Sequence, residues 1–266
     1  MNIHDLGTLT GTLMLFGGPY SNLQALQAFL READRRKVPH SRIICTGDVA
    51  GYCAHPGETV ALLRDTGISV VAGNVERQLA EGAQDCGCGF EPGSTCEGLS
   101  AAWFAHADRA IDGAAREWMK ALPDVCVFTH EGLRYAVVHG GLSDISRFLW
   151  PTTPDADFAQ EIAAIAAACG PVDGVISGHC GLAFERVIGD VHWINAGVIG
   201  MPPHDMRPDT RFVVLSKDGA RIERLSYDAK GAAQAMQKAG LTQGYDTALI
   251  SGIWPSEDIL PAEMRS

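Results

Sequence analysis

The chain has 266 residues, of which 46% are hydrophobic and 20% charged, and its formal net charge is −11. This composition is typical of a globular protein that can bury a sizeable core. The acidic balance argues against binding to a nucleic-acid duplex, which requires Lys and Arg against the phosphates. It does not exclude phosphate esters, because a bound cation can invert the local field.

The sequence carries no internal repeat, low-complexity tract or long linker, so a single domain over residues 1–266 is the simplest expectation. Residues 1–16 lack the basic start and cleavage site of a signal peptide, and the apolar run 12–16 is too short to span a bilayer. Eight cysteines in such a chain favour a reducing compartment. We therefore expect a cytoplasmic protein without a membrane partner. The oligomeric state stays open, a homo-oligomer included.

Apolar and amphipathic segments alternate along the first half of the chain. In chain order we expect a strand at 12–16, a helix at 22–37, a strand at 43–45, a helix at 57–66, a strand at 68–72 and a helix at 75–82. A Cys- and Gly-rich insertion loop follows at about 85–98. This βαβαβ order predicts a parallel arrangement of the first strands.

The second half favours hairpins over crossovers, with turn signals at Gly189-Asp190 and Asp218-Gly219. Here we expect helices at 99–110, 113–121 and 156–169, strands at 125–129, 133–138, 175–177, 183–188, 191–195, 211–216 and 220–226, and a helical C-terminal tail at about 229–266. The two halves together predict an α/β protein with two sheets packed face to face and helices outside.

Four polar residues follow predicted strands, each beside a glycine: Asp48, Asn74, His139 and His179. Ligand sites in α/β sheets gather at the carboxyl ends of strands. One carboxylate, one amide and two imidazoles suit a single divalent transition metal such as Mn, Fe or Zn. Each position alone is weak evidence, but the ordered set predicts a metal site.

Three segments resemble conserved loops of the calcineurin-like metallophosphoesterases, in the bacterial phosphodiesterase and diadenosine-tetraphosphatase-like branch. Residues 47–52 resemble its GDxxGY loop, residues 73–77 its GNHE loop and residues 195–202 its NPGSVGxPR loop. The similarity runs from about residue 12 to 216. It implies a four-layer α/β/β/α sandwich with two mixed sheets, and metal binding by the four residues above.

The departures from the family pattern all concern the first of its two metal ions. Residues 18–22 replace the family's Asp-x-His-Gly-Asn, so Gly18 and Tyr20 stand where two ligands are expected. Gly181 replaces the second His of Gly-His-x-His, and Val75 replaces the His of GNHE. The resemblance therefore implies a single-metal or remodelled site of reduced activity.

We expect Asp48, His179 and Tyr20 to be catalytic, and Asn22, His55 and Asn74 to bind substrate. Two roles are open for Tyr20, which either donates to a phosphoryl oxygen or fills the space of the missing ion. Glu76 is expected to cap a helix or to pair with Arg77 or a loop, without a catalytic role.

The cysteines give a second hypothesis. Cys86, Cys88 and Cys96 fall in the insertion loop, while Cys53 and Cys180 lie in loops beside the predicted metal site. Their thiolates could hold a second metal in place of the first ion. The spacing C-x-C-x7-C matches no zinc or iron–sulfur pattern, so free thiols or an oxidation disulfide remain the alternative.

The leading functional hypothesis is metal-dependent hydrolysis of a small phosphate mono- or diester. Two alternatives remain open. The first is a catalytically silent relative with a binding or regulatory role, and the second is a metal-thiolate or redox protein that uses the cysteine loop.

Overall fold

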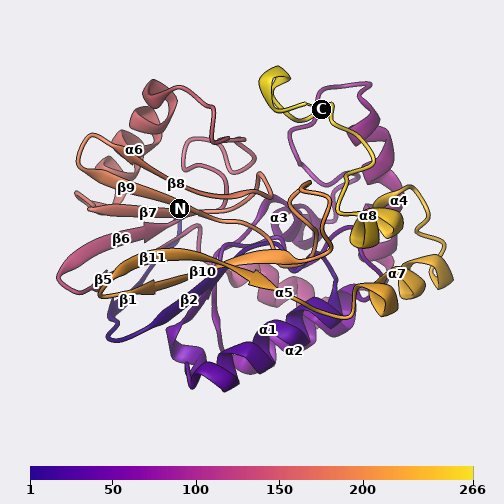
Figure 1. Cartoon of the computed structure of the whole chain (residues 1–266), viewed down its shortest axis with the longest axis horizontal. Coiled ribbons are helices and arrows are strands. Elements are labelled where there is room, and N and C mark those ends of the chain that lie inside the picture. Colours follow the sequence, from indigo (N-terminus) through magenta and orange to yellow (C-terminus); the bar gives the residue numbers. More distant parts are fainter. Residues whose placement is uncertain (266) are drawn as a thin grey trace.

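The computed structural model describes residues 1–265 and contains two mixed sheets flanked by eight α-helices (Figure 1). The first sheet has the strand order β1 (Ile3–Thr8), β5 (Val125–His130), β6 (Leu133–Val137), β7 (Gly174–Ser177), β9 (Val191–Ala196) and β8 (Ala183–Ile188). The second has the order β11 (Gly219–Leu225), β10 (Thr210–Ser216), β2 (Leu13–Phe16), β3 (Ile43–Cys45) and β4 (Ser69–Val70).

The helices connect these strands and cover the sheets from outside. They are α1 (Leu23–Arg36), α2 (Pro56–Thr66), α3 (Asn74–Glu81), α4 (Thr95–Ala110), α5 (Gly113–Ala121), α6 (Asp155–Cys169), α7 (Ala229–Lys238) and α8 (Tyr245–Ser251). Two short 3₁₀ helices lie at His40–Arg42 and Ala262–Met264.

The side chains of β2 point alternately to the two faces of its sheet, and this shows how the layers are held together. Leu13 and Leu15 are fully buried in the cluster between the two sheets. Met14 and Phe16 point to the opposite face, and the Phe16 ring lies 4.3 Å from that of Phe29 in α1. Successive residues of a strand face opposite sides, so one apolar run serves two core layers. On the outer face of the first sheet, α6 contributes its buried apolar residues to a third cluster.

This arrangement confirms the predicted four-layer α/β/β/α sandwich. The strands β2 and β3 pair in parallel, as do β3 and β4. Their carboxyl ends therefore meet at one edge, and the parallel pairs β6–β7 and β7–β9 add the ends of the other sheet.

Two local features differ from the sequence prediction. The strand β1 was missed because most of its residues are exposed and it lacks an apolar face. The helix α4 begins at Thr95 rather than near residue 99, because Ser94 caps it by accepting a hydrogen bond from the Glu97 amide at 3.2 Å. Cys96 therefore lies in a helix and not in a loop.

None of the helices within residues 1–265 combines the length and the apolar character needed to cross a bilayer.

The layer between the sheets makes a testable contribution to stability. Leu15→Ala should lower the free energy of unfolding by about 2–5 kcal/mol, because a fully buried side chain is lost from a close-packed layer. Val187→Ala is the control, since Val187 is 70% exposed in β8 and its truncation should cost less than about 0.5 kcal/mol. Urea unfolding measures both, and equal effects would contradict this account of the core.

Candidate metal centre

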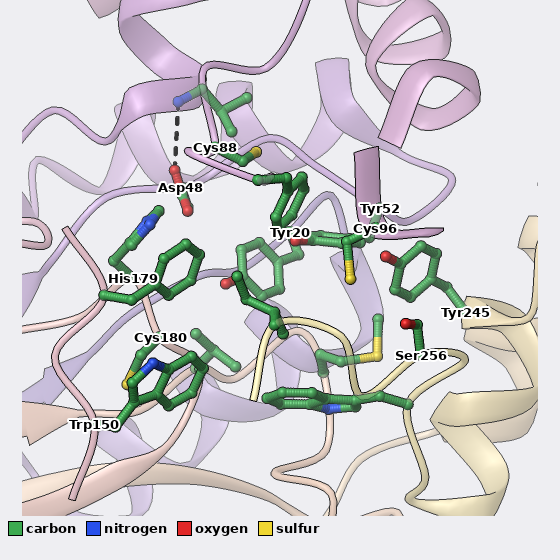
Figure 2. Close-up of a pocket in the computed structure, with 18 residues that line it drawn as sticks. Tyr20, Asp48, Tyr52, Cys88, Cys96, Trp150, His179, Cys180, Tyr245 and Ser256 are labelled. Atoms are coloured by element: carbon green, nitrogen blue, oxygen red, sulfur yellow. Dashed lines mark hydrogen bonds between the residues drawn. The ribbon is translucent and has the colours of Figure 1, made fainter. Parts of the chain in front are cut away.

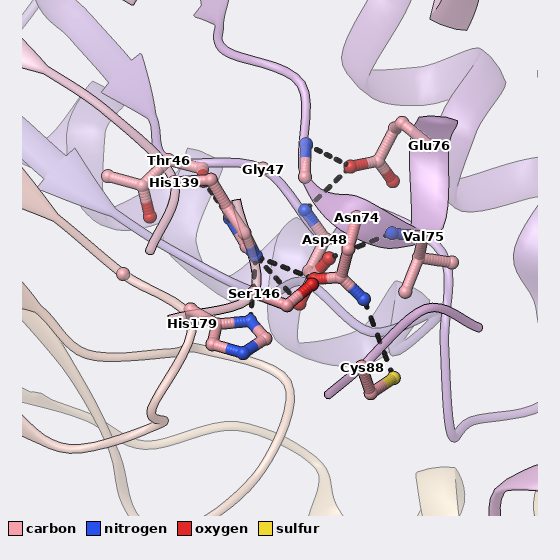
Figure 3. A network of polar contacts seen from close by, with 12 residues as sticks. Thr46, Gly47, Asp48, Asn74, Val75, Glu76, Cys88, His139, Ser146 and His179 are labelled. Carbon is pink, nitrogen blue, oxygen red and sulfur yellow. Dashed lines mark hydrogen bonds and ion pairs between the residues drawn. The ribbon is translucent and has the colours of Figure 1, made fainter. Parts of the chain in front are cut away.

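The four predicted ligands come together at the carboxyl ends of strands from both sheets (Figure 3). Asp48 follows β3, Asn74 is the first residue of α3 after β4, and His139 and His179 follow β6 and β7. Asp48, His139 and His179 each place one ligand atom within 4.8 Å of the others. All four side chains are buried.

The centre of the cluster is Nε2 of His139. The Nδ1 atom of this ring lies 2.5 Å from the Thr46 carbonyl, which can only accept a hydrogen bond, so Nδ1 carries the proton and donates. Nε2 then faces Asn74 Oδ1 at 3.0 Å, His179 Nδ1 at 3.0 Å and Asp48 Oδ2 at 3.3 Å. In the neutral ring Nε2 is an acceptor that faces two accepting oxygens, while the third neighbour, His179 Nδ1, donates or accepts according to its tautomer.

The side-chain nitrogen of Asn74 fixes the orientation of its amide group. Its nitrogen donates to the Cys86 carbonyl at 2.8 Å and lies 3.5 Å from Cys88 Sγ, so its oxygen faces the cluster. A single cation would satisfy all four converging atoms. The hydrogen bond from His139 to a backbone carbonyl is also the support that metal-binding histidines commonly receive. The donor set therefore fits a divalent metal ion.

Burial and the charges of neighbouring groups shift the pKa values of Asp48, His139 and His179. Burial alone would lower the pKa of His139, but the neighbouring Asp48 carboxylate outweighs it and the net pKa is raised. Burial and the nearby His139 lower the pKa of His179 to about 3. Burial opposes ionisation of Asp48, yet the two histidines hold the pKa of this carboxyl below its usual range. The raised pKa of His139 and the lowered pKa of Asp48 thus both reflect the attraction between this ring and this carboxylate.

Glu76 holds the loop that presents Asp48. Its buried carboxylate accepts hydrogen bonds from four backbone amides, those of Asp48 at 2.7 Å, Val49 at 2.9 Å, Ala50 at 3.3 Å and Gly73 at 2.9 Å. Burial and the adjacent Asp48 charge raise the pKa of Glu76 to about 7. The expectation of a cap is thus met, and the partner is the metal-site loop.

The alternative partner of Glu76, Arg77, is engaged elsewhere. Its guanidinium lies 2.5 Å from Asp124. The sequence marks Glu76 through its place three residues after Gly73, at the start of a helix, and through the resemblance of residues 73–77 to the GNHE loop.

Three backbone positions with positive φ make the cluster compact. Asp48 has φ +55° and His179 has φ +64°, which turn each side chain sharply into the site. Gly47 has φ +96°, and a Cβ there would lie 2.6 Å from the Gly73 nitrogen and 2.9 Å from His139 Nδ1. Only glycine allows the two ligand loops to approach so closely.

Tyr20 lies against Gly18 and lines the same pocket as Asp48. A Cβ on Gly18 would lie 2.7 Å from Tyr20 Cζ, so a side chain at position 18 and the ring of Tyr20 exclude each other. The residue is 5% exposed, and its ring lies 4.6 Å from that of Tyr52. A Cβ on Gly181 would lie 3.4 Å from the Trp254 ring, an ordinary van der Waals distance, so Trp254 packs against this position.

Two of the residues expected to bind substrate, Asn22 and His55, lie outside the pocket that contains Asp48. The Asn22 amide donates to the Gly200 carbonyl at 3.0 Å and accepts from the Ala25 amide at 3.1 Å, which caps α1. His55 precedes α2 and lines a separate open groove beside α7. Neither residue lines the pocket that Asp48 and His179 share. Asn74 does belong to the cluster.

The cysteines do not form a second ligand set in this structure. Cys86 and Cys88 are joined in a disulfide, and a disulfide sulfur has no thiolate charge to offer a metal. Cys53 and Cys180 each place sulfur within 3.8 Å of a backbone carbonyl, and burial raises the pKa of both thiols. Cys96 is also buried and its pKa is raised for the same reason. The alternative of a disulfide therefore fits better than thiolate ligation.

Removal of the Glu76 carboxylate should weaken metal binding. Glu76→Ala leaves buried backbone amides without acceptors and frees the Asp48 loop, so metal affinity should fall about 10–100-fold. Glu81→Ala is the matched control, since Glu81 is an exposed acid of the same helix. Metal titration by calorimetry checks this. An unchanged affinity in Glu76→Ala, with the control also unchanged, would show that the loop needs no such support.

Metal binding should also depend on pH. A metal ion and a proton compete for His139 Nε2, and the pKa of this ring is raised above 6.5. Apparent affinity should therefore be constant at high pH and begin to fall, as pH is lowered, at a value above 6.5. Calorimetry across pH 5.5–9 in buffers of different ionisation enthalpy measures it, and a fall that begins only well below pH 6 would contradict this proton assignment.

Comparison with known proteins agrees with this geometry. The family model described as the calcineurin-like phosphoesterase superfamily domain matches residues 20–219. A stretch of 55 residues is 44% identical to an uncharacterized protein of Methanocaldococcus jannaschii, and it covers 21% of this chain and 22% of that protein. The match thus spans about a fifth of the length of that relative.

Solved structures show the same fold. A hypothetical protein from Pyrococcus horikoshii OT3 superposes with a TM-score of 0.73 at 14% identity, over 92% of this chain and 99% of that one. A metallophosphoesterase from Sphaerobacter thermophilus superposes with a TM-score of 0.68 at 19% identity, over 92% of this chain and 100% of that one. With the family match across most of the sequence, the chain belongs to the calcineurin-like phosphoesterase superfamily.

Proposed function

We propose that this protein hydrolyses a small phosphate ester with one divalent transition metal ion, Mn, Fe or Zn, held by Asp48, Asn74, His139 and His179. The observation that carries the proposal is the convergence of their potential ligand atoms at His139 Nε2, in a chain of a phosphoesterase superfamily. When bound, the ion would polarise the phosphoryl group and lower the pKa of a water molecule.

The residues around the site keep the ligands in place. Thr46 fixes the tautomer of His139, the Cys86 carbonyl orients Asn74, and Glu76 holds the Asp48 loop. Because these supports are buried and hydrogen-bonded, the ligand geometry is preorganised before substrate arrives.

Tyr20 is the candidate hydrogen-bond donor to the ester. It lines the same pocket as Asp48 and His179. Burial, followed by the nearby Asp48 charge, raises the pKa of Tyr20 well above 10, so the phenol stays protonated. We propose that it donates to a phosphoryl or leaving-group oxygen, a role that the family's first ion and its ligands would otherwise fill.

The missing first ion limits the reaction. Gly18 and Gly181 offer no ligand, and Val75 offers no acid. The site therefore lacks a second clamp on the phosphate. We expect turnover of esters with good leaving groups and slow turnover of alkyl esters.

A second candidate is a metal-dependent binding protein without turnover. The observation that favours it is the Tyr20 ring, which fills the space against Gly18. The two candidates share the metal site and differ only in hydrolysis.

One experiment combines metal content with activity. Elemental analysis of the purified protein should find about one equivalent of transition metal, and Asp48→Ala should lose it together with hydrolysis of p-nitrophenyl phosphate and bis(p-nitrophenyl) phosphate. Tyr20→Phe should keep the metal and lower kcat about 10–100-fold, because only the hydroxyl is removed.

The outcomes separate the candidates. Metal binding without hydrolysis of either ester, with Mn, Fe or Zn supplied, would leave the binding role. Absence of any bound metal after such loading would overturn both. An unchanged kcat in Tyr20→Phe would remove Tyr20 from the reaction and leave the metal site intact.

A further inference from the structure

The cluster of Asp48 and His179 lies at one end of an enclosed pocket, and Tyr245 and Ser256 lie at the other (Figure 2). The space that the centre of a water molecule can reach in this pocket is about 60 Å³. One water needs about 10–15 Å³ by this measure, so the pocket has room for a group larger than a single solvent molecule.

Its walls carry almost no charge. No Lys or Arg among residues 1–265 lines it, and apart from Asp48 and His179 the lining consists of apolar residues, glycine, phenols, two thiols, the disulfide-bonded Cys88 and one serine. Burial raises the pKa of Tyr52 and Tyr245, so these phenols are neutral. A chain of several phosphates would meet no positive charge beyond the metal site, and anions without a counter-charge are costly to bury. The pocket therefore suits a ligand with one phosphoryl group.

The walls are instead built of packed rings. The Phe148 ring lies 4.3 Å from His179 and is stacked on Trp150 with centroids 5.4 Å apart. Across the pocket, Tyr52 lies 4.6 Å from Tyr20 and 4.8 Å from Tyr245. Rings that touch one another in this way are held in place and present flat apolar faces.

The pocket is also lined by two segments that do not belong to the loops at the strand ends. Phe90 comes from the loop between α3 and α4, while Trp254 and Ile259 come from the C-terminal tail beyond the family match at 20–219. The tail is fixed in place, since Trp254 Nε1 donates to the Pro202 carbonyl at 2.7 Å and its backbone amide to His204 Nδ1 at 2.8 Å.

We propose that this pocket binds the apolar, ring-bearing organic group of a phosphate monoester or phosphonate whose single phosphoryl group lies at the Asp48–His139–His179 cluster. This inference rests on the proposed function for the place of the phosphoryl group. It adds the class of substrate: an aryl or similarly hydrophobic ester, not a nucleoside polyphosphate.

Binding of two non-hydrolysable compounds to the Mn²⁺-loaded full-length protein tests it. Phenylphosphonate should bind about ten-fold or more tightly than methylphosphonate, because only the ring reaches the apolar walls, where each buried methylene alone is worth about ten-fold or more. Isothermal titration calorimetry measures both. Equal affinities for the two compounds would overturn the inference.

Substitutions in the pocket walls test where the phenyl ring binds. Trp254→Ala should reduce the preference for phenylphosphonate at least about five-fold while changing the affinity for methylphosphonate less than about two-fold. Phe90→Ala, in the other wall segment, should act in the same direction and guards against a Trp254→Ala protein that fails to fold. Trp118→Ala is the matched control, since Trp118 is a half-buried tryptophan of α5 outside the pocket. Loss of preference in the control, or full retention in both wall variants, would place the ring elsewhere.

Hydrolysis of phenyl phosphate separates this inference from the proposed function. A ring preference without turnover would leave the pocket assignment standing and overturn catalysis. Turnover without a ring preference would leave catalysis standing and overturn the pocket assignment.

Discussion

Asp48, Asn74 and His179 converge on one nitrogen of His139, and much of the surrounding structure holds them there. The oxygens of Asp48 and Asn74 repel the lone pair of this nitrogen, and burial keeps solvent from screening that repulsion. A cation bound between these atoms would convert it into attraction. Fixed acceptors therefore orient the ligand residues: the Thr46 carbonyl accepts a hydrogen bond from His139, and the Glu76 carboxylate accepts one from the Asp48 amide.

The sandwich supplies the positions for this cluster. The parallel strands β3 and β4 of one sheet and β6 and β7 of the other end at the same edge, so each contributes one ligand. The layer of Leu13 and Leu15 between the sheets sets their separation. Packing in the core and ligand geometry at the edge are therefore linked, because a shift between the sheets would move His139 and His179 relative to Asp48.

Aromatic rings pack against the two glycines that stand where the family resemblance implies first-ion ligands. Tyr20 lies against Gly18, and Trp254 lies against Gly181. Both rings line the pocket of Asp48 and His179, so this side of the site is an apolar wall. The disulfide of Cys86 and Cys88 lies on the same rim, where the Cys86 carbonyl orients Asn74.

The sequence by itself determined most of the elements, the four-layer architecture and the four residues of the cluster, because strand and helix periodicity and ligands beside glycines are local signals. It also indicated the lost first-ion ligands. It missed β1, whose exposed residues give no pattern. Asn22 and His55 were expected to bind substrate, and the structure places both outside the pocket of Asp48 and His179. Only the tertiary structure decided that Glu76 holds the Asp48 loop and that the C-terminal tail closes the pocket. Those contacts join residues far apart in the chain, and their partners follow from packing rather than from any local pattern.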